Sequence, residues 1–82
     1  MKSLIIGYGA TGKSFEKYLT KNSIDFDIFD EDKAKLENKN NILDCLNDKS
    51  ISVYKNLYIS PGIQLKKYFS PSKILKLNFI SD

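Results

Sequence analysis

The chain has 82 residues, a formal net charge of +3 at pH 7, one cysteine and no histidine. This length suffices for one small domain spanning residues 1–82, and the lone Cys45 with no histidine excludes a disulfide, a Cys/His metal cage and a Ser-His or Cys-His catalytic pair. The 13 basic residues are all lysine and are spread along the chain, whereas nucleic-acid-binding proteins cluster basic residues and favour arginine, so no nucleic-acid partner is expected.

The N-terminal third predicts a βαβ unit. Leu4–Ile6 is a short apolar run ending in glycine, which is typical of a strand buried on both faces. From Thr11 the apolar residues follow helical spacing, and a second strand is expected over residues 26–29, closed by the acidic turn at 30–32. Because the first apolar run is far too short for a signal-peptide core or a membrane span, we expect a cytoplasmic protein with no membrane partner.

The remaining residues predict further strands and helices in alternation. We expect a short helix at 33–39, a weak third strand around 42–43, and a clearer strand at Leu57–Ile59 that ends in the turn Ser60-Pro61-Gly62. Ser70 followed by Pro71 is typical of a helix start and predicts a helix to about residue 76. A last strand is expected over 77–80.

This alternation indicates an α/β fold, namely a Rossmann-like three-layer sandwich with about five parallel strands in the order 3-2-1-4-5. In such a fold the ligand binds at the carboxyl ends of the strands. The chain stops at Asp82, directly after the last expected strand. We therefore expect it to be the first domain of a longer protein.

The stretch GYGATGKS from Gly7 to Ser14 fits two phosphate-binding patterns. In a P-loop, Lys13 would reach the phosphates and Ser14 would bind Mg²⁺, but a Walker-B aspartate on a later strand is missing. In a Rossmann unit, Gly7 makes the tight turn, Gly9 lets the backbone approach the ligand and Gly12 lets the helix pack closely on the strand. That arrangement also requires an acid near the end of the second strand to bond a ribose hydroxyl, and Asp30 stands there. The spacing therefore favours the Rossmann interpretation.

Three stretches carry a family resemblance: LIIGYGATGKSFEKYL, the acidic ending FDIFDED, and NLYISPGIQL. Together they resemble the N-terminal domain of MurD-type Mur ligases, and LNFISD resembles the last strand before the central domain of that family. The likeness covers essentially the whole chain. The pattern G-x-G-x-T-G-x-S joined to a later S-P-G-I is more specific than a bare G-x-G-x-x-G.

The resemblance implies a division of labour among three domains. In this family the first domain grips the uridine diphosphate of UDP-N-acetylmuramoyl-L-alanine, the central domain holds ATP and Mg²⁺ in its own P-loop, and the C-terminal domain brings D-glutamate. The reaction forms an acyl phosphate on the precursor, which the amine of D-glutamate attacks, in peptidoglycan synthesis. By the same resemblance this chain lacks the central and C-terminal domains, has no cofactor, catalytic residue or metal ligand of its own, and is inactive alone.

Residue by residue, the resemblance implies three groups of UDP contacts. Backbone amides of the glycine stretch and the Thr11 hydroxyl touch the UDP moiety, Asp30 and Glu31 face uridine, and the turn after the later strand approaches the diphosphate. The expected UDP-binding set is Gly9, Ala10, Thr11, Gly12, Asp30, Glu31, Ser60 and Gly62.

The chain departs from the family at one position of this site. Relatives often carry a basic residue two positions after the aspartate, where this chain has Asp32. A carboxylate near a diphosphate is unfavourable unless it points away. Lys66 and Lys67 are interpreted first as solvated surface lysines and second as a source of positive charge.

Two other interpretations remain open from the sequence. A regulatory NAD(H)- or nucleotide-sensing Rossmann domain of a potassium transport system begins in the same way, but such sensors continue their third strand into a G-D-A turn and lack S-P-G-I. A scaffold or interaction module would bind no nucleotide at all.

Overall fold

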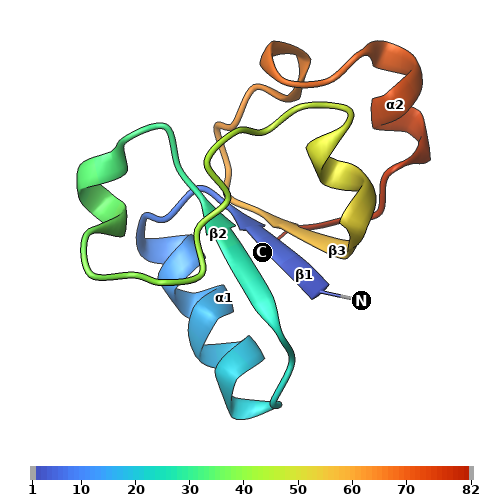
Figure 1. Cartoon of the computed structure of the whole chain (residues 1–82). Coiled ribbons are helices and arrows are strands. Elements are labelled where there is room, and N and C mark those ends of the chain that lie inside the picture. Colours follow the sequence, from blue (N-terminus) through green and yellow to red (C-terminus); the bar gives the residue numbers. More distant parts are fainter. Residues whose placement is uncertain (1, 82) are drawn as a thin grey trace.

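The computed structural model describes residues 2–81, so Met1 and Asp82, the two ends of the expected domain, lie outside it. A single parallel sheet has the strand order β2-β1-β3-β4, with the strands ending at one edge of the sheet (Figure 1). The expected α/β, Rossmann-like architecture is confirmed. Its strands are β1 (Lys2–Ile6), β2 (Phe26–Phe29), β3 (Tyr54–Ile59) and β4 (Phe79–Ser81).

Two α-helices and three short 3-10 helices connect the strands. The α-helices are α1 (Ala10–Lys21) and α2 (Pro71–Lys76). The expected start of α2 is confirmed, because the Ser70 hydroxyl accepts a hydrogen bond from the Lys73 amide and Pro71 opens the helix. The 3-10 helices are η1 (Lys33–Leu36), η2 (Ser50–Val53) and η3 (Leu65–Lys67).

Two expectations are wrong in part: the sheet has four strands and not five, and the helix expected over residues 33–39 is shorter. The described residues form four strands, and the expected third strand is reduced to one parallel bridge between Ile42 and Ile28. The neighbouring residues at 37–41 and Asp44 are polar and cannot cover the sheet, so pairing stops after one residue. The helix at 33–39 is only the 3-10 turn η1, and Asn38 has φ +70, which is incompatible with a continuing helix.

The sheet separates two apolar layers. Alternate residues of β1 point to opposite faces, so Ile5 packs with Leu19 of α1 and Ile28 of β2, whereas Leu4 and Ile6 pack with Ile51 of η2. Side chains from η3 and α2 also join the second layer, on the face opposite α1 (Figure 1). The fold is therefore a sandwich of three layers, with α1 on one face of the sheet and η2, η3 and α2 on the other.

The starts of two strands and of one helix differ from the sequence-based expectation. β3 begins at Tyr54, earlier than expected, and β4 starts at Phe79 and not at residue 77. α1 begins at Ala10, which leaves only Gly7, Tyr8 and Gly9 between β1 and the helix. Within residues 2–81, no helix has both the length and the apolar character required to cross a bilayer.

Candidate functional site

The glycine loop between β1 and α1 is shaped by close backbone packing. Gly7 has φ +92, a conformation that other residues rarely adopt. A β-carbon at Gly12 would lie 2.1 Å from the Gly7 carbonyl oxygen, so only glycine allows α1 to approach β1 this closely. The turn and packing roles expected for these two glycines are confirmed.

The N-terminus of α1 is open. Gly9 is its N-cap and offers no side chain to cap the helix, and the first helical hydrogen bond runs from the Lys13 amide to the Gly9 carbonyl at 3.0 Å. The amides that precede Lys13 therefore have no carbonyl partner within the helix. A β-carbon at Gly9 would meet nothing within 4 Å, so the backbone here is accessible to a ligand, and the helix dipole favours an anion.

Lys13 and Ser14 do not have the geometry of a P-loop. The Lys13 ammonium lies 5.7 Å from the centre of the Tyr8 ring, and the Ser14 hydroxyl donates to the Ala10 carbonyl within its own helix. Both residues belong to the body of α1. They do not fit Mg-ATP, because the lysine would have to reach the phosphates and the hydroxyl the metal.

Asp30, at the carboxyl end of β2, is bonded to the glycine loop. Its Oδ2 accepts a hydrogen bond from the Tyr8 amide at 2.7 Å, and its Oδ1 accepts one from the Asp32 amide at 2.8 Å. Hydrogen bonds from amides to a carboxylate are stronger than neutral ones. The acid that sequence analysis assigned to the ligand therefore also fixes the shape of the loop.

The Asp32 carboxylate caps the short helix that follows it. Its Oδ1 accepts a hydrogen bond from the Ala34 amide at 3.1 Å and so caps η1. One oxygen of this carboxylate is therefore occupied by the helix cap.

Ser60 and Gly62 follow β3 on the other side of β1. The Ser60 hydroxyl donates to the Gly7 carbonyl at 3.2 Å, so it supports the loop from this side. Gly62 has φ +86 and is exposed, and a β-carbon there would meet nothing within 4 Å. The amide of Gly62 is therefore accessible.

Two cavities join the ends of β1, β2 and β3 into one crevice. The smaller, of about 80 Å³, is lined by residues that include Gly7 and Asp30. The larger, of about 300 Å³, is lined by residues that include Glu31 and Gly62. Glu31, Ile63 and Tyr68 line both. The structure thus brings Asp30, Glu31 and Gly62 together around the crevice. The other predicted site residues line neither cavity, namely Gly9, Ala10, Thr11 and Gly12 at the start of α1 and Ser60 after β3.

Two tyrosines around the site were not predicted from the sequence. Tyr68 donates a short hydrogen bond from its hydroxyl to Glu31 Oε1, and burial together with this bond raises the pKa of Tyr68. The Tyr8 hydroxyl donates to Glu16 Oε1 at 2.5 Å, and the Lys39 ammonium lies 2.9 Å from Glu16 Oε2. The sequence did hold one signal for Tyr8, which stands between Gly7 and Gly9. A large side chain inside a glycine loop must pack against residues elsewhere in the fold.

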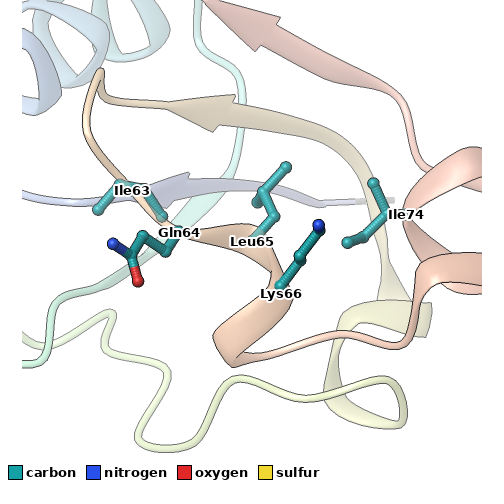
Figure 2. Close-up of a pocket in the computed structure, with 5 residues that line it drawn as sticks. All are labelled: Ile63, Gln64, Leu65, Lys66 and Ile74. Carbon is teal, nitrogen blue, oxygen red and sulfur yellow. The ribbon is translucent and has the colours of Figure 1, made fainter.

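An apolar groove adjoins this crevice. Figure 2 shows the residues that line it, with Leu65 and Lys66 from η3 and Ile74 from α2 around a cavity of about 430 Å³, together with Ile63 and Gln64. Ile63 and Gln64 also line the larger crevice cavity, whereas Lys66 does not. Of the two consecutive lysines of η3, Lys66 therefore lines the apolar groove, whereas Lys67 lines the larger crevice cavity.

The family model described as "Mur ligase MurD-like, N-terminal domain" matches residues 1–69. The chain belongs to this family. Among curated proteins, none matches the chain. Membership supports a role for this MurD-like domain in a Mur ligase, and with it in peptidoglycan synthesis. The matched range contains the glycine loop, Asp30 and the crevice, whereas α2 and β4 follow it.

The described part of the MurD-like domain offers no obvious metal centre. Among residues 2–81, no group of three or more histidine, cysteine, aspartate or glutamate side chains is placed to hold an ion. Cys45 is free and exposed. The site does offer accessible amides, which suit an anionic group of a ligand, and the fixed carboxylate of Asp30, which can accept a hydrogen bond from an uncharged donor.

Proposed function

We propose that this MurD-like domain binds the uridine diphosphate part of UDP-N-acetylmuramoyl-L-alanine, within an ATP-dependent ligase that adds D-glutamate to that precursor. The observation that carries the proposal is the open N-terminus of α1, with amides that have no helical partner, next to a loop held by Asp30. The family match gives this geometry its context, because it covers all of these residues.

In this proposal the start of α1 and the walls of the crevice contact different parts of the ligand. The amides of residues 9–12 and the Thr11 hydroxyl face the diphosphate from α1, and the accessible amide of Gly62 approaches it from β3. Ser60 acts by supporting Gly7. Asp30 and Glu31 face the uridine, and each oxygen of Asp30 keeps a second lone pair after accepting its amide.

ATP and Mg²⁺ belong to the rest of the ligase in this proposal. The stretch that resembles a P-loop does not fit them, because Lys13 and Ser14 are engaged with Tyr8 and Ala10. We therefore expect phosphate release from Mg-ATP, UDP-precursor and D-glutamate to stay at background with this chain alone.

Calorimetric titration of UDP into three forms of the chain tests the proposal. Gly9→Val should abolish measurable binding, because the branched side chain occupies the approach to the α1 amides. Its fold should be retained, since a β-carbon there meets nothing within 4 Å. Lys13→Ala should change the binding free energy by no more than ~0.5 kcal/mol, because an exposed lysine outside the site contributes little.

Two outcomes would contradict the proposal. One is loss of UDP affinity in Lys13→Ala with binding retained in Gly9→Val, which would indicate a P-loop. The other is tighter binding of NADH than of UDP by the unmodified chain, which would favour the nucleotide-sensing alternative. Circular dichroism of each variant establishes that it is folded before titration.

A further inference from the structure

The outer rim of the crevice is formed by an ion pair across its two walls. The Lys67 ammonium, from η3, lies 2.6 Å from Glu31 Oε1, which follows β2. The Tyr68 hydroxyl donates to the same oxygen. Lys67, Glu31, Tyr68 and Gly62 all line the cavity of about 300 Å³, so this lysine and the accessible amide of Gly62 face the same cavity.

The other lysines near the site are engaged elsewhere. Lys33 donates to the Asp44 carbonyl at 3.0 Å, Lys39 pairs with Glu16, and Lys13 lies against the Tyr8 ring. Lys66 lines the apolar groove of Figure 2 and not the crevice. Among the residues that line the crevice cavities, Lys67 is the one cation.

The contact between Lys67 and Glu31 is easily exchanged. Their side chains are 58% and 51% exposed, and exposed ion pairs of this kind add little to stability. Tyr68 is held more firmly, because its ring packs edge-on against Phe29 at 5.4 Å. Glu31 therefore keeps one hydrogen-bond partner when Lys67 leaves.

We propose that Lys67 binds the diphosphate of the ligand by exchanging its contact with Glu31 for one with a phosphate oxygen, while Tyr68 continues to hold Glu31. This inference rests on the proposed function and adds a specificity residue to it. A lysine attracts a phosphate as a mobile point charge. Glu31 Oε2, which is not the oxygen that Lys67 and Tyr68 contact, is available to an uncharged donor of the nucleoside. Lys67 thus distinguishes a nucleoside diphosphate from a nucleoside.

The test compares UDP with uridine in calorimetric titrations of the 82-residue chain. Lys67→Met should weaken UDP binding by about 5- to 10-fold, which is less than the loss of a buried charge-assisted bond would cause. It should leave uridine binding within about twofold of that of the unmodified chain. Lys67→Arg should restore most of the UDP affinity. Lys66→Met is the matched control, since it removes the neighbouring charge outside the crevice, and should leave both affinities within about twofold.

Raising the salt concentration gives a second readout. The advantage of UDP over uridine should shrink with salt in the unmodified chain and depend less on salt in Lys67→Met, because the lost contact is ionic. An equal loss of UDP and uridine binding in Lys67→Met, or no loss of UDP binding, overturns the inference and leaves the proposed function standing. If the unmodified chain binds neither ligand, the proposed function fails and this inference fails with it.

Discussion

At the scale of single residues, Asp30 has two roles that a sequence pattern does not separate. The pattern places an acid at the end of the second strand for a ribose hydroxyl. In the structure the same carboxylate accepts the amides of Tyr8 and Asp32 and so connects the glycine loop to β2. A substitution of Asp30 therefore changes the protein before any ligand is added.

Asp30→Ala should lower the free energy of unfolding by about 1–3 kcal/mol without any ligand, because two amides lose a charged acceptor. Urea unfolding followed by circular dichroism measures this. Asp25→Ala, at an exposed aspartate before β2, is the control and should stay within ~0.5 kcal/mol of the unmodified chain. Equal stability of Asp30→Ala and the unmodified chain would contradict the structural role.

At the scale of elements, α1 is tied to the segment after η1 through Glu16. This carboxylate accepts hydrogen bonds from the Tyr8 hydroxyl and the Lys39 ammonium. Burial disfavours the charged form of Glu16, but the bonds from Lys39 and Tyr8 outweigh burial, so the pKa of Glu16 lies below its ordinary value of 4.5. A carboxyl group whose pKa is lowered by folding stabilises the fold above its unfolded pKa, and this stabilisation is lost as the pH falls through the folded value.

Glu16→Gln should therefore cost ~0.5–1.5 kcal/mol of unfolding free energy at neutral pH, because it removes charged contacts of a partly buried group. The deficit should shrink in acid, below the lowered pKa of Glu16, where Glu16 itself becomes protonated. Urea unfolding at the two pH values gives the difference, and Glu37→Gln, at an exposed glutamate after η1, serves as the control. A deficit that stays constant with pH would show that the charge of Glu16 does not matter.

At the scale of the whole molecule, one sheet holds two apolar layers together. Ile28 and Ile51 are both fully buried, the first in the layer beneath α1 and the second in the layer beneath η2. β1 contributes to both layers through Leu4, Ile5 and Ile6. Loss of either layer exposes one face of the central strand, so the layers should unfold together.

Ile28→Val and Ile51→Val are matched substitutions for this expectation. Each should lower the unfolding free energy by ~0.5–1.5 kcal/mol, because one buried methylene is lost. Unfolding should remain a single transition in both variants. Urea titrations followed by circular dichroism and by tyrosine fluorescence should coincide. Separate transitions for the two probes would mean that the layers fold independently.

The sequence determined the class of the fold and the glycine loop. Apolar runs such as Leu4–Ile6 are local signals of buried parallel strands, and the roles of Gly7 and Gly12 follow from spacing, because a tight turn and a close helix tolerate no β-carbon there. Ser70 with Pro71 likewise marked the start of α2 correctly. The expected strand near residues 42–43 failed because its pairing depends on cover from other segments, and here only Ile42 forms a bridge.

Tertiary structure alone decided how the site is assembled. Lys66 and Lys67 are equivalent in a sequence, but η3 directs one to the apolar groove and the other to Glu31, distant along the chain. The bonds from Tyr8 to Asp30 and from Tyr68 to Glu31 join segments that are likewise far apart along the chain. Local patterns record the conformation of a few neighbouring residues, whereas these contacts arise only when parallel strands bring their carboxyl ends to one edge of the sheet.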